Sequence, residues 1–227
     1  MNVIDLAGLT PARKQGLLSQ LVVPRPIAVI TTTDPDDGLN VAPFSYYMPV
    51  SGEPPLIAVT ICAVRQSRPE PKDTWLNLRR SGEFVVNVTT TALAEHIETV
   101  AREYPRGVSE LDVAGWHTVP SRRVAPPSLA ESPAHLECVV HEVIDRGDQG
   151  AWYSGVHIVL AEVVCVTADD AVMSAPGRID PVRLGAVGRL GYPWFVAADE
   201  RSMFPRERVP YAEVEHTGLE ASGQVSR

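Results

Sequence analysis

The amino-acid sequence predicts a mainly β protein built around an antiparallel barrel or sandwich. At least six runs rich in β-branched residues occur along the 227 residues, and short turns rather than regular helical crossovers join neighbouring runs. Hydrophobic residues make up 44% of the chain, which is enough for a sizeable core, and 20 prolines indicate many turns. Together these observations favour an antiparallel fold over a doubly wound parallel sheet.

The predicted elements begin with a helix that precedes the first strand. Thr10 and Pro11 are an N-cap followed by an N1 proline. Leu17, Leu18 and Leu21 would form the apolar side of this helix. The full set is a helix at 10–21, strands at 27–33, 39–47, 56–63, 83–89, 134–145 and 152–167, a helix at 73–81 and a helical segment at 92–103.

Turn signals and irregular segments separate these elements. DPDDG at 34–38 is a hairpin turn signal, and Pro43, which cannot donate to a ladder, restricts its strand to a sheet edge or a bulge. Residues 108–132 are irregular and are predicted to form a flap over the core. We expect a single domain over 1–198 and a C-terminal extension over 199–227 that is partly disordered.

The composition argues against several classes of partner. The formal net charge is -8 and the sequence pI is about 5.2, so neither nucleic acid nor an acidic membrane surface is expected to bind. The first residues, MNVIDLAGLTPARKQ, do not resemble a signal peptide, and no apolar run approaches the roughly 20 residues of a membrane span. Cys62, Cys138 and Cys165 lie in apolar runs, as expected of small buried side chains in a reducing compartment. We therefore expect a cytoplasmic protein.

The segment KDTWLNLRRSG at 72–82 has the pattern of a helix that binds phosphate at its N-terminus. Asp73 and Thr74 are good N-caps, and the unpaired N–H groups of a helix N-terminus attract anions. Lys72 adds a full positive charge at the same end, and Gly82 suits the position that ends the helix. The alternative interpretation is an ordinary, well-capped surface helix.

Two further segments also have alternative interpretations. VAPFSYY at 41–47 would present bulged backbone groups to the polar edge of a flat heterocycle, or it is an ordinary hairpin strand with half-buried aromatic residues. His157 lies in the strand pattern VHIVLAEV. It is either a core or strand-end histidine or a group at the mouth of a site.

Other kinds of catalytic or metal site have weaker patterns in this sequence. No GxGxxG motif leads from a strand into a helix, and no Walker A, GxSxG or HExxH motif occurs. A Ser-His-Asp triad stays open as a minor alternative because triads are defined by geometry. On a strand, His135, Glu137 and His141 share one face and Cys138 points to the other. We favour solvent-facing polar residues here over a metal site and expect no bound metal.

Taken together, the motifs resemble the flavin reductase-like family of FMN-binding split-barrel proteins, which includes the flavoredoxins. The matching segments are PRPIAVITTTD at 24–34, GLNVAPFSYYMPVS at 38–51, PPLIAVTI at 54–61 and PKDTWLNLRRSGEFVVNV at 71–88, with weaker matches at 141–148 and 180–191. The resemblance implies a six-stranded Greek-key split barrel. It also implies a homodimer with FMN in a groove near the subunit interface.

The resemblance also implies which residues surround the cofactor. Residues 42–47 would run beside the isoalloxazine ring, and residues 61–65 and 72–74 would hold the ribityl phosphate. His157 would lie near the flavin and the nicotinamide as the catalytic residue, and Arg189 would close over the flavin. The residues expected to bind the cofactor are Ala42, Phe44, Ser45, Tyr46, Tyr47, Cys62, Arg65, Lys72, Asp73, Thr74 and Arg189.

The function that the resemblance implies is hydride transfer from NADH or NADPH to FMN, which is either bound or used as a substrate. Reduced flavin would then serve a partner monooxygenase or another acceptor. One alternative is a flavoenzyme that acts on its own organic substrate beneath a lid formed by 108–132. The others are a non-catalytic FMN carrier or sensor and a β-barrel that binds no flavin.

Overall fold

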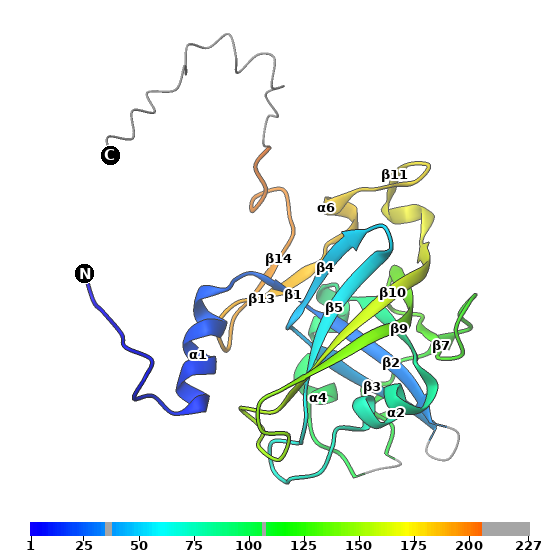
Figure 1. The fold of residues 1–227 in the computed structure, drawn as a ribbon. Coiled ribbons are helices and arrows are strands. Elements are labelled where there is room, and N and C mark those ends of the chain that lie inside the picture. Colours follow the sequence, from blue (N-terminus) through cyan, green and yellow to red (C-terminus); the bar gives the residue numbers. More distant parts are fainter. Residues whose placement is uncertain (35–37, 106–107, 206–227) are drawn as a thin grey trace, which may run out of the picture.

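The computed structural model describes residues 1–34, 38–105 and 108–205, and its main feature is a curled antiparallel sheet (Figure 1). Among these residues the sheet has seven strands, in the order β3-β2-β6-β9-β10-β5-β4. Every pair of neighbouring strands in it is antiparallel, as predicted. The strands are β2 (Ala28–Asp34), β3 (Gly38–Phe44), β4 (Tyr47–Gly52), β5 (Pro55–Cys62), β6 (Glu83–Val88), β9 (Ala134–Arg146) and β10 (Val156–Ala168).

The path of the chain closes this sheet into a barrel. β3 and β4 lie at opposite ends of the strand order, yet only Ser45 and Tyr46 separate them in the sequence. The two edges must therefore approach each other here, where the N–H of Thr60 on β5 donates to the carbonyl oxygen of Tyr46 at 2.8 Å. Within the described residues β3 pairs with β2 and not with β4, so the barrel is split between these two strands.

The region between β2 and β4 confirms two predictions and corrects a third. Asp34 pairs with Gly38, which confirms the hairpin, although residues 35–37 lie outside the described part of the chain. Pro43 lies on the edge strand β3, as its missing N–H requires. The single strand predicted over 39–47 is wrong. The chain leaves one sheet edge after Phe44 and joins the other at Tyr47, and the sheet accordingly has seven strands in place of the six implied by the resemblance.

Two apolar clusters lie on either side of the sheet. The first fills the barrel with side chains from β2, β3, β5, β6, β9 and β10, together with Leu78 of helix α2 (Asp73–Ser81). The second lies outside β2 and β3, beneath α3 (Thr91–Ala94), α4 (Ile97–Val100) and α5 (Glu110–Ala114). Trp116 and Leu129 belong to this outer cluster. The irregular segment 108–132 therefore covers apolar core, as predicted, and includes the short strands β7 (Thr118–Val119) and β8 (Ser128–Leu129).

The helical segment predicted over 92–103 is two short helices. The N–H of His96 donates to the carbonyl oxygen of Leu93 at 3.1 Å, three residues back rather than four. This tighter bond follows the end of α3 and separates it from α4. The apolar spacing survives the break, because Leu93, Ile97 and Val100 are all buried.

Helix α1 (Pro11–Leu21) has the predicted bounds and N-cap, because Thr10 Oγ1 accepts from the N–H of Arg13 at 3.3 Å. Its predicted apolar side, however, is not buried in this chain. Leu18 is 51% exposed and Leu21 is 78% exposed. The helix lies beside the barrel, near strand β1 (Arg25–Pro26), and outside the barrel core (Figure 1).

The last part of the fold consists of β10 and the short elements that follow it. The strand predicted from 152 begins only at Val156, because the N–H groups of Ser154 and Gly155 donate to the carbonyl oxygen of Ala151 in a turn. None of the helices in the described part of the chain combines the length and hydrophobicity that a membrane-spanning helix requires. The last elements are η1 (Asp170–Val172), β11 (Met173–Ala175), β12 (Arg178–Ile179), α6 (Pro181–Leu184), β13 (Val187–Arg189) and β14 (Phe195–Ala197).

Candidate functional site

A small polar pocket lies where the edge strand β3 meets the N-terminus of α2. The loop after β5, the segment after α4 and the first residue of α5 complete its walls. Its volume is about 80 Å³. The lining residues are Asn40, Ala42, Pro43, Phe44, Arg65, Lys72, Asp73, Thr74, Val100, Ala101, Arg102, Glu103 and Glu110.

Helix α2 has the predicted bounds, but its N-cap differs from the residues that the capping pattern predicted. Its N-cap is Lys72, which makes no side-chain cap hydrogen bond, and Asp73 and Thr74 form the first turn. Neither can cap the helix, because the Asp73 carboxylate is bound by Arg65 and Thr74 Oγ1 lies 3.0 Å from Asn40 Nδ2. The first N–H groups of α2 therefore point towards the pocket without a side-chain acceptor, which is the arrangement that binds anions.

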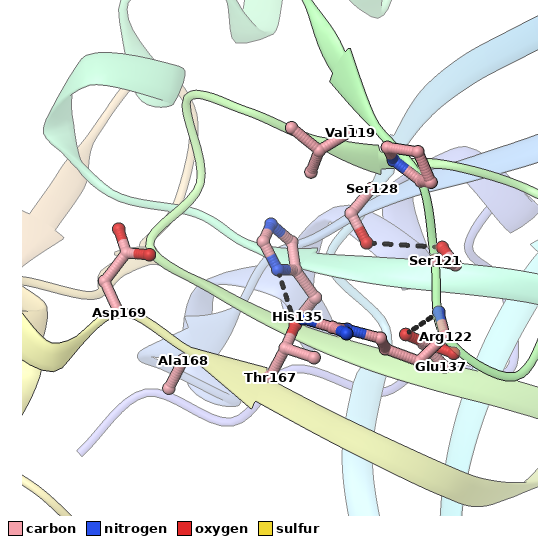
Figure 2. Close-up of a pocket in the computed structure, with 10 residues that line it drawn as sticks. Val119, Ser121, Arg122, Ser128, His135, Glu137, Thr167, Ala168 and Asp169 are labelled. Atoms are coloured by element: carbon pink, nitrogen blue, oxygen red, sulfur yellow. Dashed lines mark hydrogen bonds between the residues drawn. The ribbon is translucent and has the colours of Figure 1, made fainter.

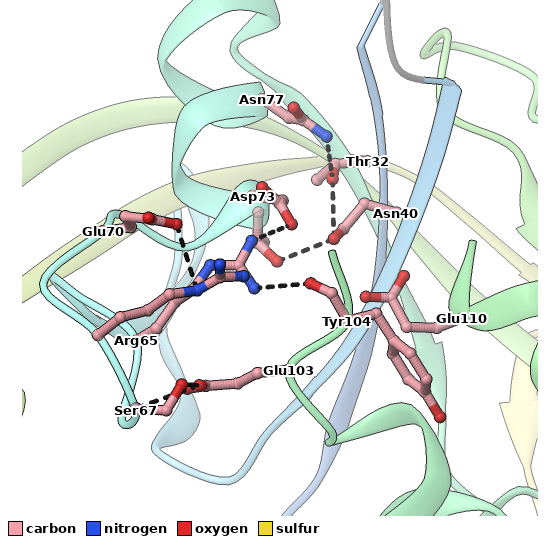
Figure 3. A network of polar contacts seen from close by, with 12 residues as sticks. Thr32, Asn40, Arg65, Ser67, Glu70, Asp73, Asn77, Glu103, Tyr104 and Glu110 are labelled. Carbon is pink, nitrogen blue, oxygen red and sulfur yellow. Dashed lines mark hydrogen bonds and ion pairs between the residues drawn. The ribbon is translucent and has the colours of Figure 1, made fainter. Parts of the chain in front are cut away.

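Arg65 is the main buried cation of this pocket (Figure 3). It is only 7% exposed. Nη2 lies 2.5 Å from Asp73 Oδ2, and Nη1 donates to the carbonyl oxygen of Tyr104 at 3.2 Å. Its Nε is buried and has no hydrogen-bond partner. A buried guanidinium with an unsatisfied donor, beside an uncapped helix N-terminus and Lys72, fits a phosphate monoester.

Two glutamates that the sequence analysis missed also face this pocket. Glu110 is 8% exposed and accepts from the N–H of Val41 at 3.1 Å, and burial raises the pKa of its carboxyl group. Burial alone would also raise the pKa of Glu103. The hydrogen bonds from Ser67 Oγ and from the N–H groups of Gln66 and Ser67 outweigh it, so this pKa is lowered. No local pattern in the sequence points to either glutamate, since Glu103 lies in the segment after α4 and Glu110 begins α5, both far from α2 along the chain.

A network of buried amides and hydroxyls fixes β2, β3 and α2 relative to one another (Figure 3). Asn77 Nδ2 donates to Thr32 Oγ1 at 3.0 Å, and Asn40 Nδ2 reaches both Thr32 and Thr74. All four side chains are buried. The pocket walls are therefore held by polar contacts as well as by the barrel core.

The predicted aromatic segment divides between two pockets. Ala42 and Phe44 line the small polar pocket, whereas Ser45, Tyr46 and Tyr47 line a neighbouring apolar pocket of about 560 Å³. Burial raises the pKa of Tyr47 to about 12, so its phenol stays protonated. The segment 42–47 thus joins the two cavities at the split in the barrel.

Three predicted residues do not line either pocket, namely Cys62, Arg189 and His157. Cys62 ends β5, and burial raises the pKa of its thiol although Lys72 opposes the shift. Arg189 Nη2 lies 3.7 Å from Glu98 Oε1. No local sequence pattern predicts that Cys62 lies near Lys72 or that Arg189 lies near Glu98, because the two members of each pair come from separate elements.

His157 is buried under helix α2. Its ring is stacked on Trp75, with centroids 3.7 Å apart, and its Nδ1 lies 2.6 Å from Asp145 Oδ1. Only 6% of the residue is exposed. Trp75, the bulky residue inside the helix, therefore covers the predicted catalytic histidine.

A third cavity, of about 570 Å³, lies beside β9 and beneath the 119–122 segment (Figure 2). The expectation of solvent-facing residues is confirmed for His141, which is exposed, and is wrong for the other two, because His135 is 7% exposed and Glu137 is fully buried. The polar groups are already paired. His135 bonds to Thr167 Oγ1 and the carbonyl oxygen of Leu129, both at 2.9 Å, and Glu137 accepts from the N–H groups of Arg122 and Arg123. These two side chains serve to hold the flap to the barrel.

Comparisons with known proteins agree with this arrangement. The profile of the family described as flavin reductase like domain matches residues 19–179. An uncharacterized protein of Halalkalibacterium halodurans is 39% identical over 174 residues, which cover 77% of this chain and 81% of that protein.

Solved structures share the fold over nearly the whole chain. Nitrilotriacetate monooxygenase component B from Bacillus cereus has a TM-score of 0.81 at 27% identity, covering 91% of this chain and 98% of that one. The 2-nitrobenzoate 2-nitroreductase NbaA from Pseudomonas fluorescens has a TM-score of 0.80 at 25% identity, covering 98% and 100%. The chain therefore belongs to the flavin reductase-like domain family and has the split-barrel fold that its sequence resembles.

Proposed function

We propose that this protein is an FMN-binding oxidoreductase. When bound, the flavin would supply the redox chemistry, accepting at N5 a hydride from nicotinamide C4 of NADH or NADPH. The observation that best supports this proposal is the uncapped N-terminus of α2 beside the incompletely satisfied Arg65. The protein's own part is to bind the flavin, to orient it and to shield it.

The small polar pocket would hold the phosphate end of FMN. Lys72 and Arg65 would neutralise the phosphate, and the first N–H groups of α2 together with Thr74 would complete its hydrogen bonds. A volume of about 80 Å³ lies below the range of roughly 300–1,000 Å³ of pockets that enclose whole ligands, so the ring system must lie outside it. Glu103 and Glu110 would face the ribityl hydroxyls, for which carboxylates are suitable acceptors.

The segment 42–47 would lie along the ring system. Because β3 is an edge strand, its outward backbone groups are available to the polar edge of a flat heterocycle. Phe44 and Tyr46 would pack near the ring. Cys62 would lie near the phosphate end, and Arg189 would close over the flavin.

His157 would act through Trp75 rather than by direct contact, because the indole covers its ring. The bond from His157 to Asp145 fixes the imidazole, and the stacked imidazole fixes Trp75 in the first turn of α2. We propose that His157 thereby positions the nicotinamide or shields the reacting face of the flavin. In this role it is a positioning residue.

The acceptor of the electrons defines two candidate functions. The likeness to a monooxygenase component B supports a reductase that supplies reduced flavin to a partner monooxygenase. The likeness to a nitroreductase, together with the apolar pocket at the split, supports a flavoenzyme that reduces its own organic substrate. A flavin carrier without turnover is the third candidate.

We propose further that the protein is a homodimer. Apolar side chains on β4 and β10 remain exposed, with Met48 at 58%, Val50 at 47% and Val166 at 62%. A second copy would bury this face and cover the free edge of β4.

The test is an absorption spectrum of the protein mixed with FMN, desalted and then treated anaerobically with NADH or NADPH. Retained flavin absorbance that bleaches with either nucleotide supports the reductase and identifies its preferred reductant. Retained absorbance that neither nucleotide bleaches would favour the carrier. If no flavin is retained, turnover with excess free FMN decides, and its absence would contradict the proposal.

A further inference from the structure

The apolar pocket at the split has the size and lining of a small-molecule site. Its volume is about 560 Å³, within the roughly 300–1,000 Å³ typical of ligand pockets. Leu18 and Val22 of α1 form one wall, and Met48 and Ile158 form part of the opposite side. Apolar atoms dominate its surface, so it favours a ligand with an apolar body.

One buried cation interrupts this apolar lining. Arg25 lines the pocket and is only 7% exposed. Its Nη1 donates to the carbonyl oxygens of Ser19 and Val22 at 2.5 and 3.0 Å, whereas its Nε is buried and has no hydrogen-bond partner. Among the residues that the structure describes, no carboxylate forms an ion pair with Arg25.

Within the described part of the chain, the surroundings of Arg25 do not supply a negative charge that would compensate its own. Its partner in the β1–β13 ladder is a second arginine, Arg189. Burial lowers the pKa of Arg25, Tyr46 opposes this shift and Arg189 adds to it, and the guanidinium remains protonated at neutral pH. The nearest aromatic partner, Tyr46, has its ring centroid 5.6 Å from the guanidinium carbon and cannot supply a full negative charge. A buried charge without a counter-ion is costly, so an anionic ligand would gain from neutralising it.

We propose that this pocket binds an aromatic carboxylate, with the carboxylate on Arg25 and the ring between α1 and Tyr46. A phosphate ester fits less well, because a hydrated dianion gains little from apolar walls. The location beside the flavin rests on the proposed function, since residues 45–47 belong to the segment expected to run along the ring. The binding of the carboxylate to this pocket does not rest on the proposed function.

The test measures the binding of benzoate, and of its uncharged isostere benzamide, to the full chain by ligand-observed NMR without any nucleotide. Leu18→Glu places a negative charge at the mouth of the pocket on a helix without buried residues. Benzoate should bind more tightly than benzamide, and Leu18→Glu should weaken benzoate binding roughly fivefold more than it weakens benzamide binding, because both probes lose an apolar contact but only benzoate meets the added charge. Leu21→Glu, on the same helix but outside the lining, is the matched control and should alter neither.

A second variant tests the cation directly. Arg25→Gln should abolish the preference for benzoate over benzamide, with a thermal melt to check that α1 stays docked. Equal binding of the two probes to the wild type, or equal effects of the two α1 variants, would overturn the proposal. So would loss of benzoate binding once FMN is loaded, because the flavin ring would then occupy the pocket. Failure to bind FMN, by contrast, would leave the benzoate result intact and count only against the proposed function.

Discussion

The indole of Trp75 lies flat on the imidazole of His157, with ring centroids 3.7 Å apart and planes inclined by 14°. This stack joins the first turn of α2 to β10, and the bond from His157 to Asp145 extends the link to β9. The N-terminus of α2 is thus anchored to the barrel wall at the point where it forms the small polar pocket that we propose for the phosphate.

Replacing His157 with alanine should therefore affect chemistry more than cofactor binding. Trp75 would lose the surface that orients it, whereas Lys72 and Arg65 would remain in place. We expect the rate of flavin reduction by NAD(P)H to fall by a larger factor than the affinity for FMN. The lost stack and the cavity should cost about 1–3 kcal/mol of unfolding free energy. Stopped-flow reduction and a flavin titration give the two factors, and His141→Ala, at an exposed histidine on β9, is the control. Equal reduction rates in wild type and variant would remove His157 from the site.

Lys72→Ala should weaken FMN binding without unfolding the protein. Lys72 lies at the N-cap and makes no side-chain cap bond, so the helix does not depend on it. A hydrogen bond to a charged group contributes about 1.5–3 kcal/mol, so affinity should fall roughly 10- to 100-fold. Fluorescence titration with FMN and with riboflavin measures this, and riboflavin affinity should not change.

The matched control for that experiment is Arg68→Ala, which removes a cation from the same loop. Arg68 pairs at the surface with Glu70, and the variant should bind FMN as the wild type does. An unchanged FMN affinity in Lys72→Ala would refute the assignment of the phosphate pocket.

Glu110 should make stability depend on pH. Burial raises its pKa in the folded protein above the unfolded value of about 4.3. Between these two values the folded state binds more protons than the unfolded state, so the unfolding free energy contributed by this group falls as pH rises. Glu110→Gln keeps an acceptor for the N–H of Val41 and cannot titrate. The variant should gain stability relative to wild type as pH rises above about 4.3, and then level off.

Urea unfolding at a series of pH values between roughly 4 and 8 measures this difference. The same substitution at Glu95, an exposed residue, controls for the loss of one negative charge. A difference between Glu110→Gln and wild type that stays constant across the series would show that burial does not shift this carboxyl group.

Val50→Glu should disrupt the proposed homodimer. Val50 is 47% exposed on the edge strand β4 and does not line either flavin-side pocket. A buried, unpaired carboxylate at a subunit interface would be costly, so the variant should be largely monomeric by light scattering. Val113→Glu, on α5 and also 47% exposed, should leave the mass unchanged. A wild-type protein that is monomeric at all concentrations would contradict the proposal.

Local sequence features determined much of the fold. Helix α2 has its predicted bounds, 73–81, because Gly82 adopts the left-handed conformation (φ 69°) that ends a helix, and β-branched runs mark the strands. Pro43 marks an edge strand, and Lys72 stands at the N-terminus of α2, because these effects depend on one residue and its near neighbours.

Tertiary structure alone decided which distant groups share the site. Glu110 reaches Val41 across 69 positions, and Arg25 bonds to carbonyl oxygens of α1 and of the residue after it and pairs with Arg189 of β13, with no ion-paired carboxylate among the described residues. The capping pattern at 72–74 was also redirected, since Arg65 binds the Asp73 carboxylate that would otherwise cap the helix. Periodicity and capping propensity describe each residue only in relation to its neighbours along the sequence. The pairing of charges and the burial of His157 under Trp75 arise when the barrel closes.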